Sequence, residues 1–249
     1  MSQSLQKGID ALLYLSSKKS AGVTEIAEAL GVNKSTAFRI LDTFVSYNMA
    51  EKVKETGKYK LGPAILKLSH QYYSGLSAVA AAKPWLIKIS ELSGESSHLG
   101  VLANNSAVIV DQIIADSRLV VNAKMGGGEP LYASAVGKCL LAFSEEPYQS
   151  KMLASITFES FTEKTIKDEA ALTAELDDIR LKGYAVDEGE LSKDIRCVAA
   201  PIFNNRGECR YAIGISGAVS RMPKEAVEAA AAILVKAANA ISAELGYIK

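Results

Sequence analysis

The stretch TEIAEALGVNKSTAFRILDTF, residues 24–44, predicts two short helices joined by a tight turn. Apolar residues recur at helical spacing on one face of each helix: Ile26, Ala27 and Leu30, then Ile40, Leu41 and Phe44. Gly31 lies between the two helices, and glycine readily adopts the left-handed backbone conformation that such a turn uses. The pattern is that of a helix-turn-helix, although ordinary core hairpins can also carry a glycine at the turn.

Polar residues occupy the outer side of the second helix. They are Asn33, Lys34, Ser35, Thr36 and Arg39, which together offer hydrogen-bond donors and two cations. In a helix-turn-helix this end of the second helix enters the major groove of DNA. Donors of this kind suit phosphate oxygens and base edges, so we predict DNA contacts for Lys34, Ser35, Thr36 and Arg39.

A hairpin signal follows at once in AEKVKETGKYKL, residues 50–61. Two short alternating runs flank Glu55, Thr56 and Gly57, as the strands of a β-hairpin would. A hairpin directly after a recognition helix is the wing of a winged helix. Its lysines, at positions 52, 54, 58 and 60, can reach flanking phosphates, and we predict that Lys58 does so.

Length and charge favour two domains. The chain has 249 residues and no net charge, but residues 1–62 carry nine Lys or Arg against six Asp or Glu. A slightly basic small domain beside a slightly acidic larger one fits a nucleic-acid-binding module with a separate partner. A helix from Leu5 to about Ser16 is expected to place Leu5, Ile9, Leu12, Leu13 and Leu15 on one face that packs under the helix-turn-helix.

Several classes of protein are disfavoured. No apolar run looks long enough to span a bilayer and no signal peptide begins the chain, which favours the cytoplasm. Three scattered cysteines without CxxC spacing and only two histidines argue against a disulfide framework and a metal site. We expect no cofactor.

The region after the wing should begin with a linker, residues 63–93, that is helical and interrupted near Gly75 and Pro84. Its apolar residues, among them Leu66 and Leu68, could pack on a second copy or on the same chain. Beyond it the periodicity predicts an antiparallel sheet with helices on it. The expected strands cover residues 96–103, 107–114, 119–123, 184–187, 195–203 and 208–216, and the expected helices begin near Ser134, Asp168 and Pro223.

The segment LYASAVGKCLLAF, residues 131–143, is a candidate ligand site. Small residues begin the helix at Ser134, so a ligand can approach the first backbone N–H groups closely. Helix N-termini favour anions, and a small carboxylate would fit there. Small residues can equally serve close packing between a helix and a sheet.

The segment 183–203 holds a second concentration of polar residues. Glu188, Glu190 and Asp194 read as a solvated acidic loop. Asp187, by contrast, ends an apolar strand and Cys197 begins the next, so both could line one cavity and hydrogen-bond a ligand.

Catalysis is disfavoured. The cysteines could act as nucleophiles with His98 as base, but nothing in the sequence brings these residues together, and a buried thiol is usually a small apolar group. The run Gly126–Gly128 lacks the features of a phosphate-binding loop and is expected to be a flexible loop.

Motifs along nearly the whole chain resemble those of the IclR family of bacterial transcription regulators. The matching segments are SLQKGIDALLYLS, VTEIAEALGVNKSTAFRILDTF, KYKLGPAILKL, EPLYASAVGKCLLAF, KGYAVDEGE, IRCVAAPIFNNRGE and AIGISG. The resemblance implies an α+β chain: a winged helix-turn-helix at residues 1–62, a linker helix at 63–93, and a GAF-like effector-binding domain at 94–249. It also implies a dimer or a dimer of dimers on palindromic double-stranded operator DNA.

The resemblance further implies small organic or aromatic acids as effectors. Carried onto this sequence, its pocket positions are Ala135, Val136, Asp187, Ile195, Cys197, Gly214 and Ser216, with Glu129 near the mouth. Gly214 replaces a serine, and Val136 replaces a smaller alanine. In the first domain, Tyr47-Asn48-Met49 replaces the usual glycine-bearing turn before the wing. The expected function is a ligand-responsive regulator that represses a catabolic operon; a metabolite-binding or enzymatic domain with an N-terminal assembly module is the alternative.

Overall fold

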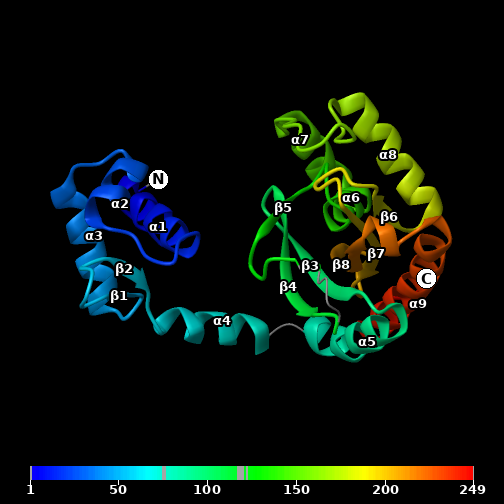
Figure 1. Cartoon of the computed structure of the whole chain (residues 1–249), viewed down its shortest axis with the longest axis horizontal. Helices are drawn as coiled ribbons and strands as arrows, with labels where there is room; N and C mark the ends of the chain where they lie inside the picture. The colour runs from blue at the N-terminus through cyan, green and yellow to red at the C-terminus, as the bar shows by residue number, and fades with distance from the viewer. Residues whose placement is uncertain (1, 75–76, 117–120, 122, 249) are drawn as a thin grey trace. The chain divides into compact units, whose positions relative to one another are not determined.

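The computed structural model describes residues 2–74, 77–116, 121 and 123–248, and it divides the chain into two compact units, residues 1–76 and 77–249 (Figure 1). The expected strand at residues 119–123 falls largely outside the described residues. The first unit consists of α1 (Gln3–Ser16), α2 (Val23–Leu30), α3 (Lys34–Ser46), β1 (Ala50–Lys52), β2 (Tyr59–Leu61) and α4 (Ala64–Ser74). The predicted helix-turn-helix and wing are both present.

The core of the first unit joins the three helices to the wing. Its fully buried residues are Ala11, Leu15, Ala21, Ile26, Ala27, Leu30, Ala37, Leu41, Ala50 and Tyr59. Ala21 and Tyr59 exchange two backbone hydrogen bonds of 2.8 Å, which attach the loop before α2 to strand β2. The wing is therefore held as part of the domain.

The expectation for α1 was wrong in part. Leu15 is buried, but Leu5, Ile9 and Leu13 are 64%, 50% and 63% exposed. Residues 5, 9 and 13 follow one another every four positions, so they form a separate apolar stripe on the helix. Ala11 and Leu15 form the stripe that faces the core.

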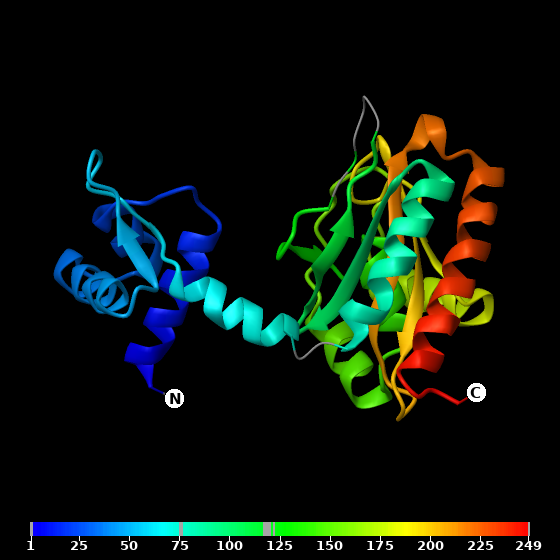
Figure 2. The ribbon, with the colours of Figure 1, turned by 90° about the horizontal axis from the view of Figure 1, so that it is seen from below.

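The second unit is a six-stranded antiparallel sheet covered by helices on both faces. Its elements are α5 (Ser77–Ser93), β3 (Ser96–Ala103), β4 (Ser106–Ile113), β5 (Gly128–Pro130), α6 (Ala135–Ala142), α7 (Glu146–Ser155), α8 (Glu169–Lys182), β6 (Ala185–Asp187), β7 (Ile195–Phe203), β8 (Cys209–Ala218), a 3-10 turn (Val219–Arg221) and α9 (Lys224–Glu244). The strand order is β5-β4-β3-β8-β7-β6. Helices α5 and α9 lie side by side on one face (Figure 2), whereas α6 and α8 lie on the other.

Two expectations about breaks in regular structure need correction. The expected break near Gly75 lies outside the described residues. Helix α5 continues through Pro84. Pro84 and Ala80, four residues earlier, are both exposed, so water can replace the hydrogen bond that proline cannot donate. The run Gly126–Gly128 is not simply a loop, because Gly128 begins β5 and pairs with Val108.

Helix α7 was not expected, and helix α9 is long and apolar. By length and composition α9 could cross a membrane, contrary to the expectation that no apolar run is long enough. Leu234, Ala237 and Ile241 on α9 are fully buried against the sheet. Its apolar character thus supplies one half of the core.

Candidate DNA-binding surface and effector site

The turn of the helix-turn-helix is built as its sequence predicts. Gly31 has φ 61°, in the left-handed region, and ends α2. Asn33 caps α3, because its side-chain oxygen accepts hydrogen bonds from the N–H of Thr36 (2.8 Å) and the hydroxyl of Ser35 (2.7 Å). The cap fixes where α3 begins and orients Ser35.

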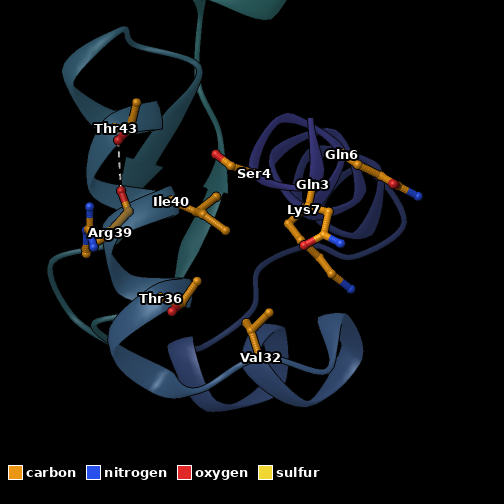
Figure 3. A pocket seen from close by; sticks show the side chains of 9 residues that line it. All are labelled: Gln3, Ser4, Gln6, Lys7, Val32, Thr36, Arg39, Ile40 and Thr43. Atoms are coloured by element: carbon orange, nitrogen blue, oxygen red, sulfur yellow. Dashed lines mark hydrogen bonds between the residues drawn. The ribbon is translucent and has the colours of Figure 1, made fainter. Parts of the chain in front are cut away.

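The four predicted contact residues on α3 lie on its outer side. Lys34, Ser35 and Arg39 are exposed and Thr36 is half-buried, while Ala37 and Leu41 face the core. Arg39 forms no ion pair with any other described residue, so its guanidinium is available to a partner. Thr36 and Arg39 also line a groove of about 720 Å³ between α3 and the start of α1 (Figure 3).

The wing lysines are less free than those on α3. The ammonium of Lys58 lies 3.0 Å from Glu25 on α2, and that of Lys60 lies 3.0 Å from Glu51. The hydrogen bond from Lys58 lowers the pKa of Glu25. Because both partners of the Lys58 pair are more than two-fifths exposed, the pair is weak and a phosphate can replace the carboxylate.

Asn48 solves the turn into the wing without a glycine. It has φ 55°, one of two non-glycine residues with positive φ in the described chain. Asparagine tolerates this conformation better than most residues. The N–H of Met49 then bonds to the carbonyl of Phe44 (2.8 Å), closing the end of α3.

In the second unit, three predicted effector residues form one row across the sheet. Asp187 pairs with Cys197 and Cys197 with Ser216, and directly paired residues project to the same face. The Sγ of Cys197 lies 3.1 Å from the Oγ of Ser216. Asp187 accepts hydrogen bonds from the N–H groups of Gly189 (2.9 Å) and Glu190 (2.6 Å).

Other predicted effector residues lie beside this row on the same face of the sheet. Ile195 lies two residues before Cys197 on the same strand and so on the same face, half-buried. Gly214 pairs with Ala199 one step along the sheet, again on the face that carries α6. Glu129 lies in β5, and burial, aided by the charge of Asp187, raises its pKa.

The N-terminus of α6 faces the sheet from above this row. The Ser134 hydroxyl accepts a 3.0 Å hydrogen bond from the N–H of Gly137, and the Ser134 carbonyl accepts one of 2.9 Å from the backbone N–H of Lys138. The N–H groups of Ala135 and Val136 have no hydrogen-bond acceptor among the described residues, although both residues are 1% exposed. Two unpaired buried N–H groups at the positive end of a helix favour an anion.

One expectation about the acidic segment was wrong. Glu188 and Asp194 are exposed, but Glu190 is only 6% exposed and lies 2.6 Å from the ammonium of Lys138, which is itself 1% exposed. Glu175 binds the same ammonium at 2.8 Å. Burial raises the pKa of Glu190 to about 7 and raises that of Asp187.

The pairing of Lys138 with Glu190 was not predicted, because the residues around Lys138 indicate a buried helix and those around Glu190 indicate an exposed loop. Lys138 stands in an otherwise apolar helix, and Glu190 stands among exposed acidic residues. A lysine within a run of apolar residues was the only available signal that a buried carboxylate must pair with it.

The described residues hold no group of three or more His, Cys, Asp and Glu suited to a metal ion. Burial raises the pKa of all three thiols, Cys139, Cys197 and Cys209, which keeps them protonated and poorly nucleophilic.

A winged helix-turn-helix with a free polar recognition face, followed by a domain with a buried anion-favouring site, defines a ligand-responsive DNA-binding regulator. The family model "IclR helix-turn-helix domain" matches residues 4–54, and "Bacterial transcriptional regulator IclR C-terminal" matches residues 70–243. The chain belongs to the IclR family of bacterial transcriptional regulators, which are not enzymes.

Individual relatives are similar to this chain along nearly its whole length. It is 30% identical to the transcriptional repressor IclR of Escherichia coli (strain K12) over 250 residues, covering 99% of this chain and 91% of that one. An IclR regulator structure from Alicyclobacillus acidocaldarius matches with TM-score 0.86 at 28% identity over 98% of both chains. An IclR homologue from Microbacterium hydrocarbonoxydans, crystallised with 4-hydroxybenzoate, shares the fold with TM-score 0.81 at 22% identity, covering 98% of this chain and 99% of that one.

Proposed function

We propose that this regulator is a cytoplasmic repressor of a catabolic operon, and that Lys34, Ser35, Thr36 and Arg39 contact its operator. The observation that carries the proposal is the N-capped start of α3, where exposed Lys34 and Arg39 stand beside a hydroxyl held by Asn33. Such a surface suits base edges and phosphates of the major groove. Lys58 exchanges Glu25 for a backbone phosphate.

The effector of this proposal is a small organic or aromatic acid. Its carboxylate accepts hydrogen bonds from the N–H groups of Ala135 and Val136, at the start of α6. Asp187, Cys197 and Ser216 face the rest of the molecule, with Ile195 as an apolar contact and Glu129 at the edge. The 4-hydroxybenzoate bound by the related protein supports an acid of this size.

The burial of the effector site links effector binding to DNA binding. Ala135, Val136, Asp187 and Ser216 are all at most 5% exposed, so a ligand enters only when their surroundings open. A ligand that binds one conformation better than another shifts the population by that difference in affinity. The acid therefore changes the fraction of the regulator that is competent to bind DNA.

The assembly we propose is a homodimer, or a dimer of such dimers, on a palindromic operator. Two exposed apolar sets support it: the stripe of Leu5, Ile9 and Leu13 on α1, and Leu66 and Leu68 on α4, which are 72% and 56% exposed. Apolar surface gathered in this way marks an interface. A second copy covers it and places two α3 helices for two operator half-sites.

The test is fluorescence-anisotropy binding of the full-length protein to its own upstream DNA and to scrambled DNA at fixed salt. Selective binding that one acid changes is the expected result. Absence of selectivity at every salt concentration would contradict the proposal and favour a metabolite-binding protein with an N-terminal assembly module.

A further inference from the structure

His98 lies within the second unit, and one nitrogen of its buried ring has no hydrogen-bond partner among the described residues. Its side chain is 3% exposed, and its Nδ1 is buried and unpaired. Gln112 on β4 is its direct partner across the sheet, and the Oε1 of Gln112 is also buried and unpaired. Buried unpaired side-chain atoms are uncommon, and here two of them belong to paired residues on one face.

The position of His98 on the sheet brings it to the candidate effector site. His98 pairs with Gly214 on β8, and the row on one side of this pair contains Ser216 and Cys197. On the other side, Gly100 contacts the Val136 side chain: a Cβ added to Gly100 would lie 2.3 Å from its Cγ1. His98 is therefore between the polar row and the start of α6.

Gly214 provides the space for the imidazole ring. A Cβ added at Gly214 would lie 2.8 Å from the Nε2 of His98. The ring thus extends over Gly214 toward the strand that also carries Ser216. A serine at position 214 would compete with the ring for this space.

The two unpaired atoms indicate which ring nitrogen carries the proton. Burial lowers the pKa of His98 to about 4, so the ring is neutral near pH 7. The Oε1 of Gln112 can only accept a hydrogen bond, so the tautomer that suits this cross-strand neighbour carries its proton on Nδ1 of His98. The Nε2 atom is then an acceptor, to which a hydroxyl group of a ligand can donate.

We propose that His98, positioned by Gln112, reads a hydroxyl group of the effector, which makes the effector class hydroxylated carboxylic acids. The carboxylate lies at the N–H groups of Ala135 and Val136, and the hydroxyl donates to Nε2 of His98. This assignment rests on the proposed function, because it presumes that the α6 face binds the effector.

The first test observes the ring directly in the full-length protein. The chain has only two histidines, His70 and His98, so two-bond ¹H–¹⁵N spectra near pH 7 resolve both, and the spectrum of His98→Phe identifies the signal of His98. The expected result is a neutral ring with its proton on Nδ1. A proton on Nε2 would overturn the proposal whatever ligand the protein binds.

The second test compares matched acids that differ by one hydroxyl: lactate with propionate, glycolate with acetate, and 4-hydroxybenzoate with benzoate. Calorimetry on the wild-type protein should give at least one hydroxylated acid bound about tenfold more tightly than its partner, with a shift of the His98 Nε2 signal. His98→Phe and Gln112→Leu should lose this preference, whereas Asn105→Ala, in the turn between β3 and β4, should keep it.

The outcomes separate this inference from the proposed function. Equal binding of every matched pair, or binding without any change at Nε2, would overturn the role of His98 while leaving the regulator intact. Absence of selective operator binding by the wild-type protein would instead count against the proposed function. Retention of the hydroxyl preference in His98→Phe would also overturn the inference.

Discussion

Arg39 stands exposed on α3, in the second turn after the cap formed by Asn33, and forms no ion pair with another described residue. Lys58 on the wing differs, because Glu25 already binds its ammonium at 3.0 Å. The two cations should therefore affect DNA binding in different ways. The planar guanidinium of Arg39 can read a base edge, whereas the ammonium of Lys58 supplies a point charge to the phosphate backbone of the DNA.

Arg39→Ala should reduce the discrimination between operator and scrambled DNA by about 1–3 kcal/mol, if a guanine is its partner. Lys58→Ala should weaken binding to both DNAs alike and reduce the salt slope by about one. Anisotropy titrations over a series of salt concentrations measure both effects. Equal losses on the two DNAs for Arg39→Ala would contradict its role in base recognition.

Glu190 should make stability depend on pH. Burial holds its pKa at about 7 against an ordinary value of 4.5, so the folded protein binds a proton that the unfolded chain releases over this range. Stability is then lost as pH rises from about 4.5 to 7, by roughly 3 kcal/mol. Besides burial, neighbouring charges act on the pKa of Glu190: the ammonium of Lys138 lowers it, and Asp187 and Glu175 raise it.

Glu190→Gln retains an acceptor for Lys138 and removes the titration. Urea denaturation of wild-type and variant proteins at several pH values should give curves that diverge between about pH 4.5 and 7, the wild type losing more stability. Parallel curves would show that Lys138 keeps Glu190 ionised throughout.

At the scale of elements, the turn between α3 and the wing depends on two residues. Asn48 has φ 55°, and a Cβ added to Gly62 would lie 2.3 Å from the carbonyl oxygen of Asn48. The N–H of Gly62 bonds to the carbonyl of Met49 (2.8 Å). The wing is thus attached to α3 by a turn with little room for larger side chains.

Gly62→Ala should destabilise the protein by about 1–3 kcal/mol, because backbone atoms must move to admit the methyl group. Gly8→Ala, in the middle of α1, is the matched control: its nearest atom is 3.5 Å away, on Phe44, and helix propensity predicts a gain of about 0.5–1 kcal/mol. Denaturant unfolding measures both. Equal stability of Gly62→Ala and wild type would contradict the described turn.

Asn48→Gly should leave stability nearly unchanged, whereas Asn48→Val should cost at least about 1–2 kcal/mol, since a branched side chain disfavours positive φ. The same unfolding measurement applies. A valine variant as stable as the wild type would mean that residue 48 does not hold this conformation in solution.

The sequence contained enough to predict the elements that local signals define. The turn at Gly31, the polar outer side of α3 and the hairpin around Gly57 all follow from neighbouring residues. The placement of Asp187 beside Cys197 also followed, because one residue ends a strand and the other begins the next. Helix α7 was missed; it combines an apolar residue such as Met152 with many polar ones and has a weak apolar face.

Features that depend on distant pairing could not be predicted in this way. Nothing near His98 indicates that β3 pairs with β8, more than 100 residues later, and so places the imidazole over Gly214. The burial of Glu190 likewise depends on Lys138 from another element. Conversely, the leucines of α1 look like core residues until the second apolar stripe, with Ala11 and Leu15, is seen to face the core.

At the scale of the whole molecule, the proposed dimer links the two functions. Leu5→Glu combined with Ile9→Glu should convert the protein to monomers, because charges would enter the proposed apolar interface, with little effect on monomer folding since both positions are at least half exposed. Light scattering with size-exclusion chromatography measures the mass. An unchanged oligomer would place the interface elsewhere. The control is Lys18→Glu, at an exposed position near the start of the loop after α1.

In the proposed regulator, one chain couples operator binding to an acid bound at the α6 face. Anisotropy with operator and scrambled DNA, with and without the panel of acids, tests it most directly. We expect selective operator binding, with an affinity that one acid changes in the wild type but not in Ser216→Ala combined with Asp187→Asn. An acid response that survives this double variant, or operator binding that no acid alters, would contradict it.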